Sequence, residues 1–280
     1  MKFGENKDME LYEKYPEFLD LFPEYGFNID NSSEDFLKNQ EFFEYLIKIF
    51  ENNWIKIENT NVELYQIAFK SFYDLYVVFI FIKIWQIKKE NSSSFYRVFK
   101  TFSSQEQNKL NIFNNLFKLS ELKESEIFKF LSVLNFHGNE LKEFGKLVNQ
   151  RNNCSHPSGF IQYTQSELNT FNNEIICFCK KIINKFRLIL FNLFKQFLID
   201  NSNYLKEDFS KEDFDEFIKI NYISKFEIKM LFEFVVDENI TYFKGEINKI
   251  ENNEVPIKQR IKNIKDLNVL FKKVYADDSL

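Results

Sequence analysis

The stretch FYDLYVVFIFIKIWQI (residues 72–87) is apolar nearly all round, and only Asp74 and Lys83 place a charge in it. It is shorter than the ~20 residues that a helix needs to cross a bilayer, so it predicts a buried core helix and no membrane span. Thr60 and Glu63 have the spacing of a capping box, which starts a helix. We therefore expect one long core helix from about residue 60 to about residue 89.

Composition extends this prediction to the whole chain. Among 280 residues, 36 Phe and 13 Tyr supply a large apolar core, whereas six Gly and four Pro are too few for the many turns of an all-β protein. The sequence predicts an all-α protein with an acidic lead-in (1–30), a helical core (31–200) and a C-terminal helical extension (201–280). Further helices are expected at 33–51, 95–102, 104–118, about 120–134, 139–155, 164–199 and 257–275. Asn139 is expected to cap the helix at 139–155, and the spacings Thr164–Glu167 and Ser224–Glu227 predict capping boxes at the starts of two helices.

Charge and cysteine content limit the environment and the partners. The formal net charge is −5, which excludes a globally basic nucleic-acid binder and leaves only a local patch for RNA. Three cysteines form no disulfide framework, and residues 1–30 are polar and acidic, unlike a signal peptide. We expect a cytoplasmic protein.

The segment RNNCSHP (residues 151–157) contains an arginine and a histidine, two residue types that are scarce in this chain. The chain has only four arginines and two histidines, His137 and His156, and it uses Lys wherever a plain positive charge suffices. An arginine offers a planar fork for phosphate or carboxylate, and a histidine titrates near neutral pH. Arg151 and His156 therefore combine a phosphate clamp with a proton carrier.

Helical phase places Arg151 beside the buried or interfacial face of its helix. Leu141, Phe144 and Val148 share that face, so Arg151 needs a partner there, and a ligand phosphate or an opposing subunit would supply one. Pro157 disfavours helical geometry at His156, so the helix should end near residue 155. If the chain leaves the helix at His156, the side chains of Arg151 and His156 can approach the same point. The C-terminus of the helix favours the protonated form of the imidazole there.

Residues 146–195 contain seven basic and two acidic residues. Lys180, Lys181, Lys185 and Arg187 lie on the helix expected at 164–199. This excess of positive charge is either a patch that steers substrate to the motif or an ordinary solvated face.

Other chemistries fit the sequence poorly. Cys154 with His156, and Cys177 with Cys179, are two residues apart, and side chains at that spacing on a helix point to nearly opposite sides. The same spacing weakens a cysteine–histidine dyad, and there is no Gly-rich phosphate loop. We expect no metal and no cofactor. Gly138 is expected to end a helix in the left-handed conformation, and His137 is expected either to cap carbonyls or to lie half-buried at that helix end.

The pattern Arg151-Asn-x-x-x-His156 resembles the motif of the HEPN family (higher eukaryotes and prokaryotes nucleotide-binding). These are all-helical domains, and many are metal-independent ribonucleases of toxin–antitoxin, abortive-infection and CRISPR-linked defence systems. The resemblance implies a multi-helix bundle of HEPN type with additional N- and C-terminal helices. It also implies an endoribonuclease in which the 2′-hydroxyl of RNA attacks the adjacent phosphate.

The resemblance assigns roles to individual residues. Arg151 and His156 would be catalytic, Asn152 would orient the histidine or a phosphate oxygen, and Ser155 is a weaker candidate for substrate contact. The composite sites of the family imply a homodimer that places two motifs face to face.

Ser158 departs from the family pattern, because toxins controlled by nucleotidyltransferase antitoxins carry a tyrosine at that position. This departure puts that mode of regulation in doubt, and the resemblance otherwise implies an antitoxin or a defence-system partner. Two alternatives remain open. One is a non-catalytic helical module that binds RNA, a nucleotide or a protein, and the other is a helical scaffold in which the motif is a coincidence.

Overall fold

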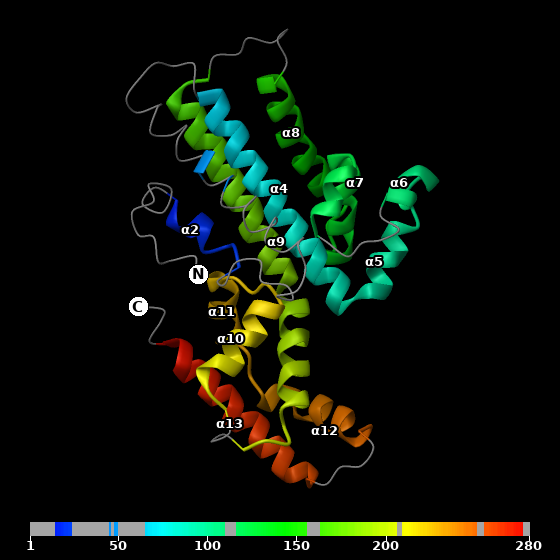
Figure 1. Ribbon diagram of the computed structural model, residues 1–280, viewed down its shortest axis with the longest axis vertical. Coiled ribbons are helices and arrows are strands. Elements are labelled where there is room, and N and C mark those ends of the chain that lie inside the picture. Colours follow the sequence, from blue (N-terminus) through cyan, green and yellow to red (C-terminus); the bar gives the residue numbers. More distant parts are fainter. Residues whose placement is uncertain are drawn as a thin grey trace.

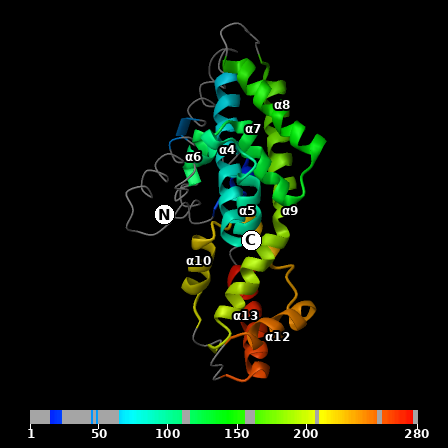
Figure 2. The same cartoon turned by 90° about the vertical axis from the view of Figure 1, so that its right-hand side faces the viewer.

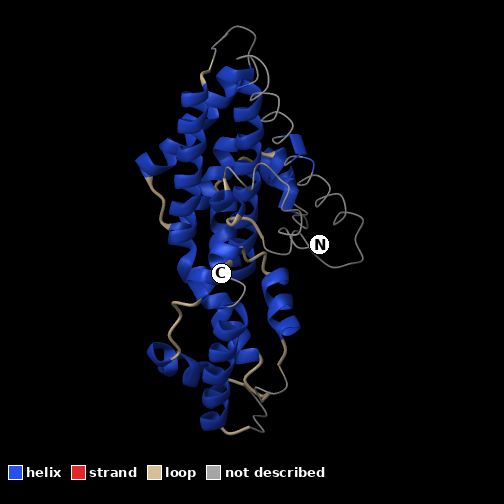
Figure 3. Ribbon diagram, turned by 90° about the vertical axis from the view of Figure 1, so that its left-hand side faces the viewer, coloured by secondary structure: helices blue, strands red, loops and turns tan. Residues whose placement is uncertain are grey.

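The computed structural model of the chain describes residues 15–23, 45, 48–49, 65–109, 116–155, 163–205, 209–250 and 255–276. These residues contain no β-strand (Figure 3), so the all-α prediction is confirmed. The one β-type pairing among them is an isolated bridge between Pro23 and Ser224. The helix expected at 33–51 and the capping box at Thr60 lie largely outside the described residues.

The described helices follow in chain order (Figure 1). The α-helices are α2 (Pro16–Leu19), α4 (Tyr65–Glu90), α5 (Ser92–Phe99), α6 (Ser104–Lys109), α7 (Glu124–Ile127), α8 (Gly138–Ser155), α9 (Gln165–Asp200), α10 (Lys211–Ile220), α11 (Lys225–Leu231), α12 (Ile240–Asn248) and α13 (Ile257–Ala276), and the 3-10 helices are η2 (Leu116–Glu121), η3 (Phe128–Leu134) and η5 (Asp237–Asn239).

Helix α4 is the buried core helix that the apolar stretch predicts. Its residues from Phe79 to Ile87 are all buried, including Lys83. It packs most extensively against α9 and also contacts α5 and α8 (Figures 1 and 2). Within the part of the chain that the structure describes, no helix combines the length and the apolar composition that a membrane crossing requires.

Helix α9 begins at the predicted capping box. The Thr164 Oγ1 accepts a hydrogen bond from the Glu167 backbone N–H at 3.2 Å, and the Glu167 carboxylate accepts from the Thr164 N–H at 2.8 Å. The helix then runs for 36 residues to Asp200, one residue beyond the expected end. α8 contacts the middle of α9 through the rings of Phe144 and Phe178 and runs in the opposite direction (Figure 1), so the last turn of α8 and the start of α9 lie at the same end of the molecule.

The junction between η3 and α8 corrects two predictions. Asn135, and not Gly138, follows η3 as the residue that ends it in the left-handed conformation (φ 58°), because asparagine tolerates this region better than other non-glycine residues. Gly138 has a positive φ as predicted, but it does not end a helix. Gly138 (φ 40°) is instead the first residue of α8, ahead of the expected cap Asn139. The His137 N–H donates to the Glu140 carboxylate at 3.3 Å, so His137 precedes a helix and does not cap the end of one.

The described part of the acidic lead-in packs into the core. It contains the short helix α2, and the burial of the aromatic residues in this segment was not predicted. Phe18 is fully buried and stacks on Phe72 of α4 at a centroid distance of 4.3 Å. The Asp20 carbonyl accepts a hydrogen bond from the Phe226 N–H at 2.9 Å, which joins this segment to α11.

Helices α10 to α13 gather around the second half of α9 (Figure 1). Phe194 of α9 is fully buried, and its ring lies 4.9 Å from Phe271 of α13, 5.5 Å from Phe234 and 5.8 Å from Phe217 of α10. α9 therefore carries apolar contacts of both the predicted core and the predicted C-terminal extension.

A buried ion pair also ties the two parts together. Lys83 of α4 donates to the Glu227 carboxylate of α11 at 2.5 Å, and both side chains are fully buried. Glu227 is also the acceptor in the predicted capping box at Ser224, whose N–H and Oγ donate to it at 2.9 Å. Lys83 donates to Gln86 at 3.0 Å as well. The charge that appeared to interrupt the apolar stretch therefore links α4 to the C-terminal helices.

Candidate active site

Arg151 lies in the last turn and a half of α8, with 24% of its side chain exposed. Phe144 and Leu147 on the same helix are buried, and α8 packs against α4 through this face. The arginine therefore sits at the edge of the buried face, as its helical phase predicts.

The partner of Arg151 is a carboxylate of the same chain. Its Nη2 donates a hydrogen bond to the Oε1 of Glu124, the first residue of α7. The Tyr73 hydroxyl donates to the other oxygen of Glu124 at 2.8 Å, and the guanidinium lies over the Tyr73 ring at 5.5 Å. The expectation that a ligand or a second subunit would be needed as partner was wrong, because α7 brings Glu124 to this position.

These contacts fix the charge and the orientation of the group. Burial, and then the negative charge of Glu124, raise the pKa of the Tyr73 hydroxyl, so the phenol stays protonated and donates. A guanidinium held by a carboxylate on one edge and by an aromatic ring on its face has little freedom to rotate. Three helices, α4, α7 and α8, thus hold Arg151 in one orientation.

Asp74 of α4 adds a carboxyl group with unusual acidity. Burial raises its pKa to about 6; Lys70 and Arg151 act to lower the pKa, and Glu124 acts to raise it. The side chain is partly exposed, and it makes no hydrogen bond or ion pair within the part of the chain that the structure describes. A carboxyl group with a pKa near neutrality next to a fixed guanidinium is suited to proton transfer.

The other predicted site residues are placed only in part. α8 ends at Ser155, as predicted, and Asn152 is partly buried one residue after Arg151. His156 lies outside the described residues, and the side-chain position of Ser155 is not among those described. The distance between Arg151 and His156 therefore stays a prediction from the motif.

The four basic residues of the predicted steering patch are each paired with a carboxylate. Lys181 and Lys185 pair with Glu140 at 3.4 and 3.0 Å, and Lys185 also donates to the Asn135 carbonyl. Lys180 pairs with Glu17 of α2, and Arg187 pairs at 2.6 Å with Glu233.

Chain direction explains why these residues do not gather at Arg151. Because α8 and α9 are antiparallel, Lys181 and Lys185 meet the first turns of α8, whereas Arg151 is near its end. Eleven residues separate Glu140 from Arg151, which is about 16 Å along a helix axis. Counting charges along the sequence placed them around the motif, but the fold brings none of these ion pairs to Arg151.

No group of three His, Cys, Asp or Glu side chains among the described residues is arranged to hold a metal ion. Cys177 is exposed and Cys179 is fully buried, so these two thiols face different environments, as their spacing predicts.

Sequence reasoning missed Tyr73, Asp74 and Glu124 as members of the site. Asp74 carried a signal, because an aspartate inside an otherwise apolar helix needs a reason to be there. Glu124 carried none, because it is one of 42 acidic residues and only the tertiary fold selects it.

Comparisons with family models, with curated proteins and with solved structures find no match to this chain. The HEPN relationship therefore rests on the Arg151–His156 motif, and it stays a prediction.

Proposed function

We propose that the chain is a metal-independent endoribonuclease of HEPN type that cleaves RNA by attack of the 2′-hydroxyl on the adjacent phosphate. The observation that carries the proposal is the cluster at the end of α8, where Glu124 and Tyr73 hold Arg151, and where the charge of Arg151 acts on the carboxyl group of Asp74, whose pKa is about 6. The motif adds His156 five residues after the arginine.

The proposed reaction assigns a proton transfer to each of two groups. Near neutral pH the Asp74 carboxylate accepts the proton of the 2′-hydroxyl, whose oxygen then forms a bond to phosphorus. The bond from phosphorus to the 5′-oxygen breaks, and that oxygen takes a proton from the His156 imidazolium. Arg151 supplies positive charge to the phosphate in the transition state. The products are a 2′,3′-cyclic phosphate and a 5′-hydroxyl, and DNA is not a substrate because it lacks the nucleophile.

The test is cleavage of end-labelled RNA in the presence of EDTA, with analysis of the product ends. Wild type should produce cyclic phosphates, and His156→Ala should cut about 10²–10⁴-fold more slowly, the usual loss for a general acid or base. Asp74→Asn should fall in the same range. Cleavage that EDTA abolishes, or products with 5′-phosphates, would rule the proposal out.

We also propose that two chains form a homodimer whose facing motifs share one active site. Mixing Arg151→Ala chains with His156→Ala chains tests this arrangement, because only a shared site receives one intact residue of each kind from different chains. The mixture should cut RNA faster than either parent. If each site is built within one chain, the mixture stays as inactive as its components. Growth arrest by wild type but not by Arg151→Ala would support a role as a toxin or an anti-phage effector in the cytoplasm.

The alternative is a non-catalytic helical module that binds RNA, a nucleotide or a protein. One observation favours it: Glu124 already occupies one edge of the Arg151 guanidinium, and a phosphate has to share or displace that contact. An inert wild type that still binds RNA tightly would support the module over the enzyme.

A further inference from the structure

Helix α13 presents a row of lysines on its outer side. The helix contains six basic residues and one acidic residue, although the chain as a whole has a net charge of −5. Its inner side is apolar: Ile264, Leu267 and Phe271 are fully buried. At 100° per residue, the opposite stripe contains Lys258, Lys262, Lys265, Val269, Lys272 and Lys273.

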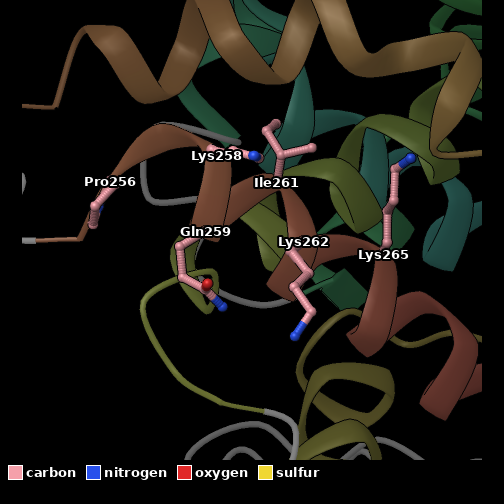
Figure 4. A pocket seen from close by; sticks show the side chains of 6 residues that line it. All are labelled: Pro256, Lys258, Gln259, Ile261, Lys262 and Lys265. Carbon is pink, nitrogen blue, oxygen red and sulfur yellow. The ribbon is translucent and has the colours of Figure 1, made fainter.

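The first half of this stripe lines a groove with a volume of about 600 Å³. Figure 4 shows its lining side chains, which all come from the start of α13 and the residue before it. Three of the six are lysines, and the others add an apolar surface and one amide. The lining residues are Pro256, Lys258, Gln259, Ile261, Lys262 and Lys265.

The three lysines of the groove form weak ion pairs or none within the described residues. Lys265 pairs with Asp237 at 2.5 Å, and Lys262 lies 3.9 Å from Asp266, the upper limit of an ion pair. Lys258 is exposed and forms no ion pair within the described residues. Exposed pairs of this kind contribute about 0–1 kcal/mol, so a polyanion can compete with them.

The spacing fits an extended polyanion better than a single phosphate. Lys262 lies about 6 Å and Lys265 about 10.5 Å along the helix axis from Lys258. A membrane surface fits less well, because the apolar side of α13 is already buried and leaves nothing to insert.

We propose that this groove binds the phosphate backbone of an RNA strand, with Ile261 and Pro256 beneath the sugars. That the strand is RNA rests on the proposed function. The groove lies at the opposite end of the molecule from the last turn of α8 (Figure 1), and α9 alone spans about 54 Å between the two ends. The groove therefore holds a part of a long RNA that is remote from the scissile phosphate.

The experiment measures binding of a short fluorescent 2′-O-methyl RNA by anisotropy between about 50 and 200 mM salt, because such a strand cannot be cleaved through its 2′-oxygen. The double variant Lys258→Gln, Lys262→Gln removes two exposed charges from the groove. We expect affinity to fall at least about tenfold at low salt, and the slope of log K against log salt to fall by about 1.4.

The matched control is Lys219→Gln, Lys229→Gln, which removes two charges from α10 and α11 outside the groove and should bind as wild type does. Equal binding by the groove variant and wild type would overturn the proposal. So would a wild type that binds phosphatidylserine vesicles and not RNA.

Cleavage is scored separately on unmodified RNA. If wild-type protein cuts RNA, and the variant without Lys258 and Lys262 binds RNA as well as wild type does, only the proposal of a binding groove is disproved. If wild-type protein cuts no RNA, but the variant without Lys258 and Lys262 binds RNA more weakly than wild type does, the proposed nuclease activity is disproved and the proposed binding groove is supported.

Discussion

Two ion pairs of this molecule have similar chemistry and different surroundings. Lys83 and Glu227 are both 0% exposed, and their charged groups are also hydrogen-bonded to Gln86 and Ser224. Arg151 and Glu124 are 24% and 23% exposed, and the charges of both act on a second carboxyl group, that of Asp74.

The difference separates a structural pair from a candidate site. The buried pair is closed to solvent, so a ligand has no access to it, and its role is to join α4 to α11. The partly exposed pair is fixed by Tyr73 and remains within reach of a substrate. Burial and access, and not the type of residue, decide which charges are available for chemistry.

The largest effect is expected from breaking the buried pair. Lys83→Met leaves the Glu227 carboxylate buried without its cation, which typically costs about 3–5 kcal/mol of unfolding free energy. The measurement is the midpoint of urea unfolding. Adding Glu227→Gln should recover most of the loss, because glutamine keeps the capping box and removes the buried charge. A loss below about 1 kcal/mol for Lys83→Met alone would contradict the structural role.

Glu124→Gln should affect cleavage more than stability. Its ion pair is partly exposed, so unfolding free energy should change by about 1 kcal/mol or less. A neutral amide holds the guanidinium less firmly, and a misplaced catalytic group costs rate, so RNA cleavage should fall about tenfold or more. If this variant is destabilised as strongly as Lys83→Met while its cleavage rate is unchanged, the two pairs have been assigned the wrong roles.

Asp74 should make stability depend on pH in an unusual direction. Its pKa rises from about 3.8 when unfolded to about 6 when folded, so the folded state binds the proton more tightly. The contribution to stability is full below pH 4 and is lost as pH rises through 6. Asp74→Asn should therefore be about 1–2 kcal/mol more stable than wild type at pH 7. Thermal melts at pH 5 and pH 7 check this, and equal pH dependence in both proteins would refute it.

The smallest effect is expected at the exposed pair of Arg187 and Glu233. These side chains are 46% and 57% exposed, and such pairs are weak. Arg187→Ala should change unfolding free energy by less than about 0.5 kcal/mol in the same urea titration. A loss of 2 kcal/mol or more would show that exposure does not rank the pairs in this molecule.

Local patterns predicted some helices well, because a capping box marks a helix start directly. The single helix expected at about 120–134 is instead divided into α7 and the 3-10 helix η3. The capping boxes at Thr164 and Ser224 lie where the spacing of Thr or Ser and Glu places them, and α13 occupies residues 257–276 against an expected 257–275. The pattern placed a helix end at Gly138, whereas the helix η3 ends at Asn135, and Gly138, which also has a positive φ, begins α8.

Only the part of the candidate site that lies on α8 could be predicted from the sequence. Helical phase placed Arg151 at the edge of the buried face, but the identity of its partner depends on how α7 and α4 pack against α8. The basic residues of the predicted steering patch do not lie around Arg151 for the same reason. A count of charges along the sequence does not show that α8 and α9 are antiparallel, which is why Lys181 and Lys185 pair with Glu140.

The most direct measurement is the RNA cleavage rate, in EDTA, of two arginine variants beside wild type. Both Arg151 and Arg187 pair with a glutamate, but Arg151 belongs to the sequence motif, and its charge acts on the carboxyl group of Asp74. We predict that Arg151→Ala cuts at least about 10²-fold more slowly than wild type, whereas Arg187→Ala cuts at the wild-type rate. Equal rates for the two variants, in proteins with equal circular dichroism spectra, would contradict the assignment of an active site to the end of α8.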